Sequence, residues 1–202
     1  MTSNTTPRRT VVANISLSLD GRVNGPGGEY DMSWIAPHAV TDAARDLMVR
    51  LTDTATTILL GRKNYEGFAG FWPPVADDEN AEPRDRATAR WLNSTEKVVF
   101  STTLTDATWQ NSWIAGADPA ATVRRLREEP GGDIVIQNSS SLIRALLDAG
   151  EVDRMMINLC PELAGGGARL FEDGVPRTSW SLTDLSTSES GAICLVYDRV
   201  TN

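Results

Sequence analysis

Short apolar runs that alternate with helix-like segments are the feature that most constrains the fold of this chain. The runs are rich in Val, Ile and Leu and end at Gly, Asp, Ser or Asn, which is typical of buried β-strands. The clearest runs are residues 11–19, 57–60, 97–100 and 133–136, with a weaker one at 113–115. Between them, apolar residues recur at helical spacing in residues 41–51, 119–128 and 142–147.

This alternation predicts an α/β protein with a mostly parallel central sheet. Three more strands close the chain without a clear helix between them, at residues 155–159, 179–185 and 193–197, so we expect antiparallel C-terminal strands. Residues 71–90 are polar, contain Pro and carry charges of both signs, which predicts a loop with one short helix. We expect a flexible tail at residues 1–9 and a single domain over residues 10–202.

Charge and hydropathy narrow the classes of partner. The chain has 27 acidic and 19 basic residues, a formal net charge of −8, and such a surface repels nucleic acid and anionic membranes. No apolar run reaches 18 residues, and the first residues lack the apolar stretch of a secretory signal. We therefore expect a cytoplasmic protein that binds a small molecule, with no nucleic-acid or membrane partner.

The cysteines and the single histidine limit metal and nucleophilic chemistry. Cys160 and Cys194 lie far apart in no metal-like spacing, which favours two buried, reduced thiols. With His38 as the only histidine, a His-rich zinc site is excluded, and a Ser-His-Asp triad is open only with His38 as its base. No metal site is predicted.

Polar groups suited to phosphate follow three of the predicted parallel strands. In open α/β sheets, ligands bind beyond the carboxyl ends of the strands, where helix N-termini and their N–H groups attract anions. The three clusters are Leu60-Gly61-Arg62-Lys63, Phe100-Ser101-Thr102-Thr103 and Asn138-Ser139-Ser140-Ser141. Each alone has a plainer interpretation, because Ser and Asn commonly cap helices and Arg62-Lys63 fits a solvated face. Together they favour a ligand with two separated phosphate regions, a dinucleotide. The Gly-x-Gly-x-x-Gly and Walker patterns are absent, which disfavours a Rossmann dehydrogenase and a P-loop ATPase.

Five segments in order resemble one known family. They are Ile15-Ser-Leu-Ser-Leu-Asp-Gly21, Leu60-Gly-Arg-Lys-Asn-Tyr-Glu66, Trp91-Leu-Asn-Ser-Thr-Glu-Lys-Val-Val-Phe-Ser101, Ser141-Leu-Ile-Arg-Ala-Leu-Leu-Asp-Ala-Gly-Glu-Val-Asp153 and Pro161-Glu-Leu-Ala-Gly-Gly-Gly-Ala-Arg-Leu-Phe171. The chain thus resembles the dihydrofolate reductase-like proteins, in particular the riboflavin-biosynthesis reductases of the RibD C-terminal group, over about residues 10–199. The resemblance implies a three-layer dihydrofolate reductase-like fold, an NADPH-dependent reductase and a homodimer.

The resemblance also assigns roles to residues of this sequence. It implies a catalytic role for Asp20, at the edge of the active-site loop, and substrate contacts for Arg50 and Gln137. The residues that match cofactor-binding positions are Ser16, Trp34, Leu60, Gly61, Arg62, Lys63, Asn64, Ser101, Thr102, Asn138, Ser139, Ser140, Ser141 and Leu142. Asp42 is a weaker candidate for the acid, at the place of the pterin-binding carboxylate of dihydrofolate reductase; a first-turn helix acid is its plainer interpretation.

The sequence also departs from the family pattern. Asn138-Ser139 stands where the family usually has a Gly pair or Gly-Ser, and Gln137 stands where the riboflavin reductases have a substrate-binding Glu. Asn64 replaces the commoner Thr, and Ser101-Thr102 lacks the Arg often found beside the 2′-phosphate. These changes leave three hypotheses open: a reductase of a small heterocyclic or ribosyl substrate, a dihydrofolate reductase-type activity, and a non-catalytic nucleotide-binding dimer.

Overall fold

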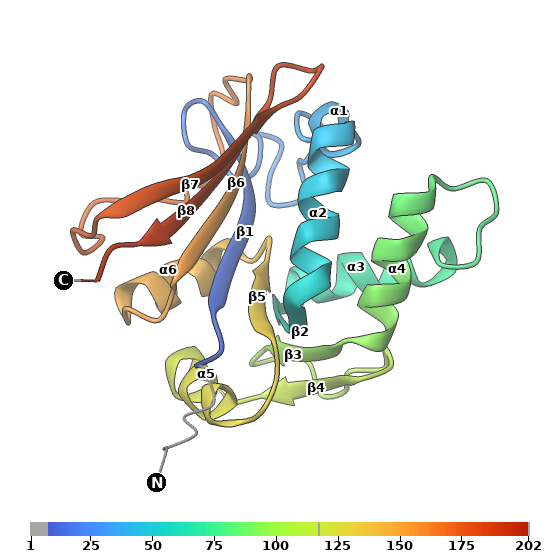
Figure 1. Cartoon of the computed structure of the whole chain (residues 1–202), viewed down its shortest axis with the longest axis vertical. Coiled ribbons are helices and arrows are strands. Elements are labelled where there is room, and N and C mark those ends of the chain that lie inside the picture. Colours follow the sequence, from blue (N-terminus) through green and yellow to red (C-terminus); the bar gives the residue numbers. More distant parts are fainter. Residues whose placement is uncertain (1–7, 117, 202) are drawn as a thin grey trace, which may run out of the picture.

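In the computed structural model, which describes residues 8–116 and 118–201, eight strands form one sheet with helices on both faces (Figure 1). The strands are β1 (Val11–Ser18), β2 (Ala55–Gly61), β3 (Glu96–Phe100), β4 (Ser112–Ala115), β5 (Asp133–Gln137), β6 (Arg154–Cys160), β7 (Trp180–Thr187) and β8 (Ile193–Arg199). The helices are α1 (Ala36–Ala39), α2 (Asp42–Thr54), α3 (Arg62–Val75), α4 (Pro83–Ser94), α5 (Pro119–Glu128) and α6 (Ser140–Asp148). None of the described helices is long and apolar enough to cross a membrane.

The sheet has the order β4-β3-β2-β5-β1-β6-β8-β7. Its first six strands are parallel, while β8 runs antiparallel to β6 and β7 antiparallel to β8. The predicted α/β class and mostly parallel sheet are confirmed. One detail differs from the prediction: β6, expected at the antiparallel edge, pairs in parallel with β1, because α6 carries the chain back across the sheet before β6 begins.

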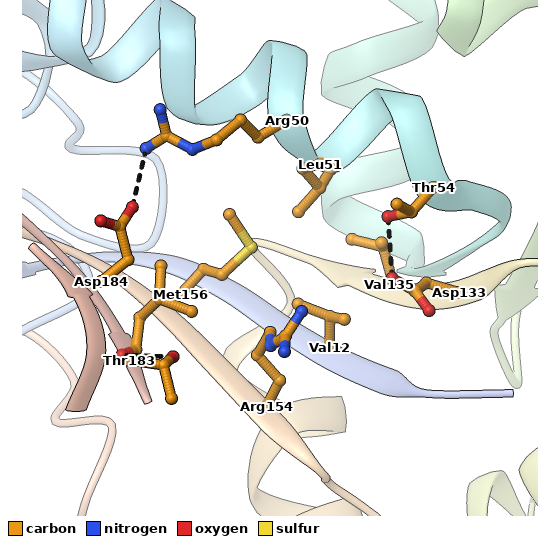
Figure 2. Close-up of a pocket in the computed structure, with 11 residues that line it drawn as sticks. Val12, Arg50, Leu51, Thr54, Asp133, Val135, Arg154, Met156, Thr183 and Asp184 are labelled. Atoms are coloured by element: carbon orange, nitrogen blue, oxygen red, sulfur yellow. Dashed lines mark hydrogen bonds and ion pairs between the residues drawn. The ribbon is translucent and has the colours of Figure 1, made fainter. Parts of the chain in front are cut away.

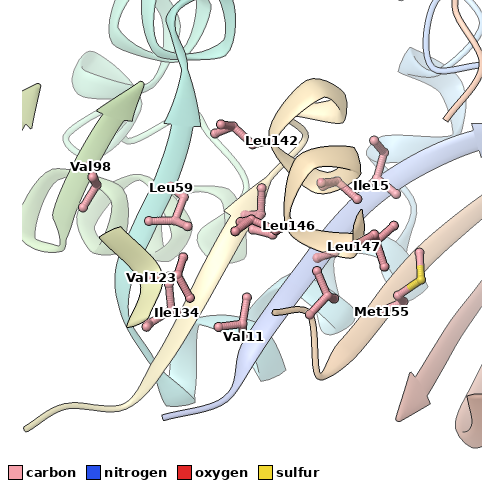
Figure 3. Packing of buried hydrophobic residues seen from close by; sticks show 14 of the residues in the cluster. Val11, Ile15, Leu59, Val98, Val123, Ile134, Leu142, Leu146, Leu147 and Met155 are labelled. Atoms are coloured by element: carbon pink, nitrogen blue, oxygen red, sulfur yellow. The ribbon is translucent and has the colours of Figure 1, made fainter. Parts of the chain in front are cut away.

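Helices pack on both faces of the sheet, so the fold has three layers with the sheet in the middle. On one face, Leu142, Ile143, Leu146 and Leu147 of α6 pack with Val123 of α5 onto β1, β2 and β5, in the largest buried cluster (Figure 3). On the other face, α2 covers Val12 and Val135, while α3 and α4 cover the β2–β3 region. Each fully buried aliphatic side chain contributes about 1.5–3 kcal/mol, so both helical layers are fixed to the sheet.

Residues 71–90, predicted as a loop with one short helix, contain the end of α3 and the first two turns of the 12-residue helix α4. Glu82 caps α4 by accepting hydrogen bonds from the N–H groups of Arg84 and Asp85, and Pro83 occupies its first turn. Ion pairs from Arg84 to Asp46 (2.8 Å) and Asp42 then fix α4 to α2. The prediction failed because these charges look like a solvated loop until the partner helix is placed.

The N-terminal boundary also differs from the prediction. Residues 1–7 of the predicted tail lie outside the described residues. Arg9, assigned to that tail, is only 6% exposed. Its guanidinium donates hydrogen bonds to the carbonyls of Gly132 and Leu126 and to the hydroxyls of Thr56 and Thr57. These contacts place Arg9 in the folded part of the chain.

Candidate functional site

Three cavities lie along the carboxyl ends of the parallel strands. The inner cavity (about 220 Å³) lies between the sheet and helices α2, α3 and α4. The central cavity (about 380 Å³) lies beside the starts of α3 and α6, and the outer cavity (about 380 Å³) lies beyond β3. Asn138 lines both the inner and central cavities, while Arg62, Phe100 and Leu142 line both the central and outer ones. The three therefore adjoin along one edge of the sheet, where α/β proteins bind ligands.

Most of the predicted phosphate-binding residues meet at the central cavity. Its lining includes nine of them: Gly61, Arg62, Lys63, Asn64, Asn138, Ser139, Ser140, Ser141 and Leu142. The first turns of α3 and α6 face it together, and neither helix has a side-chain cap. Capping by Ser139, the plainer interpretation of that cluster, is not observed. The first N–H groups of both helices are thus left for an anion, which the helix dipoles also favour.

Ser139 is turned away from its own helix and joins the two loops instead. Its buried Oγ accepts hydrogen bonds from the Gly61 N–H (2.9 Å) and from Asn64 Nδ2 (3.2 Å), and donates to the Gln137 carbonyl (3.1 Å). Asn64 Nδ2 also donates to the Asn138 carbonyl (3.0 Å). Asn138 has a φ of +50°, a left-handed conformation that Asn tolerates better than most residues. Two of the departures from the family pattern, Asn64 and Asn138, therefore belong to one network.

Cations surround the central cavity, each beside a carboxylate. Arg62 pairs with Glu66 (2.8 Å) one turn along α3, and Arg144 pairs with Glu172 (2.9 Å). Lys63 contacts Glu29 from the loop after β1. All these groups are partly exposed, and surface pairs of this kind contribute about 0–1 kcal/mol. An incoming phosphate can therefore replace a carboxylate at small cost.

The outer cavity is lined by hydroxyl groups and one cation. Ser101 and Thr102 line it with Thr103, and Arg62 is the one charged side chain among its described lining residues. Ser101 Oγ accepts hydrogen bonds from the N–H groups of Thr103 (3.1 Å) and Leu104 (2.8 Å), which fixes the turn after β3. The resemblance implied a 2′-phosphate here, and Arg62 brings a guanidinium to this cavity from a different loop.

A row of buried amides forms the sheet side of the inner cavity. Asn14 (β1), Gln137 (β5) and Asn158 (β6) all line it and are 4–8% exposed. Sheet register explains the row, because Asn14 lies opposite Gln137 and Ser16 lies opposite Asn158. Asn14 Nδ2 donates to Gln137 Oε1 (3.0 Å). The predicted residues Ser16 and Gln137 are thus brought together here, beside the central cavity.

The rest of the inner cavity is mostly apolar. Met48 of α2, Phe68 and Trp72 of α3, and Leu92 of α4 form its helical side. Its two charged lining residues, Arg45 and Asp85, form a two-bonded ion pair (3.0 and 2.9 Å). The hydrogen bonds that Arg45 donates to Asp85 raise the pKa of Arg45. A ligand in this cavity would therefore meet amides and apolar groups.

Asp20, predicted as the catalytic acid, does not line any of the three cavities. It accepts hydrogen bonds from Ser18 Oγ (2.7 Å), from Arg22 and from the N–H groups of Ala164 and Gly165. These bonds, with that from Ser18 the strongest, lower the pKa of Asp20 to about 2. A carboxyl ionised at neutral pH is a poor proton donor, and its contacts instead join the loop after β1 to residues 164–165.

Arg50, predicted to contact substrate, lies elsewhere (Figure 2). It pairs with Asp184 of β7 (3.3 Å) in a separate cavity of about 290 Å³, which shares no lining residue with the inner cavity. Arg50 follows Met48 by two residues in α2, a rotation of about 200°, so its side chain points away from the inner cavity. The other candidate acid, Asp42, is mostly exposed and pairs with Arg84, so the helix-terminus interpretation fits it better.

Two predicted cofactor residues also lie outside the three cavities. Leu60 is fully buried in the core between the sheet and α3–α4, since it precedes Gly61 inside the strand. Trp34, in the turns before α1, lines none of the three, and its buried Nε1 has no hydrogen-bond partner among the described residues.

The cysteines and the histidine are away from the three cavities. Both thiols are buried and free, and burial raises the pKa of Cys160 to about 12 and also raises that of Cys194. His38 is buried between Ser190 Oγ (2.8 Å) and Glu162 Oε1 (3.2 Å), so it joins α1 to two loops. The described residues contain no cluster of three His, Cys, Asp or Glu side chains placed for a metal ion.

Several lining residues were missed from the sequence. In the inner cavity they include Asn14, Arg45, Met48, Phe68, Trp72, Asp85, Leu92 and Asn158; in the central cavity they include Asn24, Tyr30, Phe100 and Arg144. A single amide inside an otherwise apolar strand, as at Asn14 and Asn158, was a usable signal. The residues from α3 and α4 carried none, because they meet only in three dimensions.

The architecture is a dihydrofolate reductase-like α/β fold. A dihydrofolate reductase from Enterococcus faecalis complexed with NADP(H) superposes with a TM-score of 0.56 at 16% identity, over 95% of this chain and 97% of that one. The chain belongs to the RibD C-terminal domain family, whose model matches residues 9–194.

One sequence relative and two further solved structures agree with this family assignment. The uncharacterized protein YyaP of Bacillus subtilis (strain 168) is 28% identical over 198 residues, 98% of each chain. A Shewanella sp. PV-4 protein with a provisional riboflavin-biosynthesis assignment superposes with a TM-score of 0.70 at 19% identity, over 95% of this chain and 99% of that one. The deaminase/5-amino-6-(5-phosphoribosylamino)uracil reductase of Thermotoga maritima gives 0.64 at 15% identity, over 96% of this chain and 57% of that one. Family and fold together support a reductase-type function.

Proposed function

We propose that this protein is an NADPH-dependent reductase of a small heterocyclic or ribosyl substrate. The observation that carries the proposal is the pair of uncapped helix N-termini, α3 and α6, that open on one cavity beside an amide-lined one. The two joined phosphates of a dinucleotide can each face one such helix N-terminus, and a nicotinamide needs a second compartment where a substrate can meet it.

The residues present fit NADPH. The N-termini of α3 and α6, with Arg62 and Lys63, would hold the pyrophosphate, and Ser101 and Thr102 would hold the adenosine 2′-phosphate together with Arg62. Asn138 and Ser16 lie toward the inner cavity and would border the nicotinamide. When bound, NADPH supplies a hydride to an electrophilic carbon.

The chain's own contribution is orientation and exclusion of water. Met48, Phe68, Trp72 and Leu92 shield the inner cavity, and the amide row orients a polar ring edge. No unpaired carboxyl is found among the described lining residues of that cavity, because Asp85 is bonded to Arg45. We therefore propose that water delivers the proton that completes C=O or C=N reduction. A dihydrofolate reductase-type mechanism has less support, since Asp42 pairs with Arg84 outside the cavity.

A fluorescence titration with NADPH tests the proposal. The dissociation constant should fall within the range of about 1 μM to 1 mM that is usual for KM values. Exchange of Arg62 for Gln should weaken NADPH more than NADH, because only NADPH carries the 2′-phosphate. Absence of NADPH binding up to about 1 mM would refute the function, whereas tight binding without oxidation of NADPH by any pyrimidine substrate would favour the non-catalytic alternative.

We also propose the homodimer that the resemblance implied. The edge strand β7 exposes Leu182 (48%) and Leu185 (53%), apolar area that a second copy would cover.

A further inference from the structure

Three polar side chains that are distant in the sequence meet away from the proposed cofactor and substrate cavities. They are His38 of α1, Glu162 in the loop after β6, and Ser190 in the turn between β7 and β8 (Figure 1). His38 is buried, with its Nδ1 2.8 Å from Ser190 Oγ and its Nε2 3.2 Å from Glu162 Oε1. None of these three residues lines the inner, central or outer cavity. The proposed reductase function therefore does not account for this cluster.

We propose that Ser190, His38 and Glu162 form a nucleophilic triad that hydrolyses small neutral esters. A serine hydroxyl becomes a nucleophile when a base accepts its proton and a third group orients that base. The single histidine of the chain, bonded to one hydroxyl and one carboxylate, provides this arrangement. The proposal is independent of NADPH and of the proposed reductase function.

The hydrogen bonds determine which nitrogen of the His38 ring carries the proton. A carboxylate can only accept, so the neutral ring bears its proton on Nε2 and donates it to Glu162. Nδ1 is then left to accept from the Ser190 O–H. Ser188 Oγ lies 2.8 Å from Ser190 Oγ and can donate to it, which fits this direction. Known triads have serine on Nε2 and the carboxylate on Nδ1; the two nitrogens exchange roles here, and either can act as the base.

The turn that carries Ser190 leaves backbone N–H groups open beside the hydroxyl. The Gly191 N–H donates to the Ser188 carbonyl (3.0 Å), and Gly191 has a φ of +81°. Three-residue hairpin loops commonly have this form, a tight turn followed by a left-handed residue. Neither the Glu189 N–H nor the Ser190 N–H has an acceptor among the described residues. Since Ser190 is partly exposed, these groups are available to an oxyanion, as the N–H of the nucleophilic serine is in known serine hydrolases.

The surroundings of the triad favour a neutral ester with a short aliphatic group. Leu19 and Leu163 are exposed and lie beside Glu162, because the Leu19 N–H donates to the Glu162 carbonyl (2.8 Å) and Leu163 is the next residue. They offer apolar surface to an alkyl group. The carboxylates of Glu162 and of the exposed Glu189 would repel an anionic ester.

The reaction balances with water as its one co-reactant. Ser190 Oγ forms a bond to the ester carbonyl carbon while its proton passes to His38 Nδ1. The bond from that carbon to the alcohol oxygen then breaks, and the leaving alcohol takes the proton from His38. Water attacks the acyl group on Ser190 with His38 again as the base, which releases the carboxylic acid and restores the serine hydroxyl. Glu162 contacts His38 and acts as a positioning residue.

Labelling of the wild-type protein with diisopropyl fluorophosphate, followed by peptide mass spectrometry, tests the proposal without any variant. We expect one diisopropylphosphoryl group, on Ser190. We also expect hydrolysis of p-nitrophenyl butyrate over several turnovers, with a rate that falls at least tenfold in Ser190→Ala. A Ser190 that stays unmodified at millimolar reagent, or equal hydrolysis by Ser190→Ala and wild type, would overturn the proposal. NADPH is titrated separately, so neither result bears on the reductase function.

Two further variants sharpen the test. Ser181→Ala is the matched control, because Ser181 is an exposed serine of the same hairpin whose hydroxyl makes no hydrogen bond within the described residues; it should label and hydrolyse like wild type. Glu162→Gln keeps the size of the side chain and removes its charge, so kcat for the butyrate ester should fall at least tenfold while KM is unchanged. If Glu162→Gln keeps the wild-type kcat, Glu162 does not position His38 and the triad is refuted.

Discussion

Removal of the Ser139 hydroxyl should loosen both phosphate-facing loops at once. In Ser139→Ala, the Gly61 N–H and Asn64 Nδ2 lose an acceptor and the Gln137 carbonyl loses a donor, all at a side chain that is 2% exposed. At about 1 kcal/mol for each of the three bonds, we expect a loss of about 3 kcal/mol in the free energy of unfolding. For a chain of this size, that lowers the melting temperature by about 6–12 °C.

Urea and thermal unfolding followed by circular dichroism measure this loss, and Ser140→Ala is the matched control. Ser140 lines the same cavity one residue later, but its hydroxyl makes no hydrogen bond within the described residues. Its variant should stay within about 0.5 kcal/mol of wild type. If Ser139→Ala loses less than about 1 kcal/mol, the bonds at Oγ do not hold the loops together.

Cofactor binding gives a second readout of the same network. If the loops must be reordered on binding, Ser139→Ala should weaken NADPH about tenfold, or about 1.4 kcal/mol. Asn64→Ala should cost less stability, because it breaks only the bonds to the Asn138 carbonyl and Ser139 Oγ. The double variant should be less destabilised than the sum of the two, since both remove the same Asn64–Ser139 bond.

Three further predictions concern the acid, the core and the dimer. Asp20→Asn should leave the shape of the pH–rate profile between pH 5 and 9 unchanged, because the pKa of about 2 keeps Asp20 ionised throughout this range. A rate loss above about a hundredfold in a folded variant would instead indicate that Asp20 is the proton donor. Lys97 is fully buried, and burial lowers its pKa from 10.5 to about 8. Between pH 8 and pH 10.5 the unfolded chain therefore binds one proton more than the folded protein. In that range the free energy of unfolding of wild type, relative to Lys97→Met, should rise with pH by about 1.4 kcal/mol per unit. If urea unfolding shows that this difference does not change with pH, the reasoning is wrong. Leu185→Asp should halve the mass measured by light scattering if β7 pairs two copies, and an unchanged dimer mass would place the interface elsewhere.

The fold was largely predictable because its signal is local. The runs of β1, β2, β3 and β5 are apolar enough to be buried on both faces, and α2, α5 and α6 each carry an apolar stripe, so the order of the elements implies the sheet. The exceptions depend on distant contacts: α4 carries few apolar residues and is held to α2 through Arg84, while Arg9 is fixed by carbonyls more than a hundred residues away. The sequence around Arg84 or Arg9 does not indicate these distant partners.

The same difference between local signals and distant contacts applies to the candidate site. The strand-end clusters at Gly61 and Asn138 were predictable, because a parallel sheet brings carboxyl ends to one edge whatever the register. Assignments by resemblance were weaker where a side chain's direction decides its role: Leu60 points into the core, and Arg50 points to Asp184. A sequence match gives the position of a residue along its strand or helix. The direction of the side chain at that position then determines which cavity it lines.

The inner cavity was the least predictable part, and the reason is the sheet register. Asn14 and Asn158 are more than 140 residues apart in the chain, and each alone is only an amide inside an apolar run. The pairing of β1 with β5 sets Asn14 opposite Gln137, and the pairing of β1 with β6 sets Asn158 opposite Ser16, two residues further along β1, so all three amides reach the same cavity. The neutral Gln137, which stands where the riboflavin reductases have a Glu, has a role of its own, because its Oε1 accepts a bond from Asn14 that orients both amides. A Glu at this position would also accept that bond but would bring an unpaired charge into the buried amides, so Gln137 keeps this side of the inner cavity neutral.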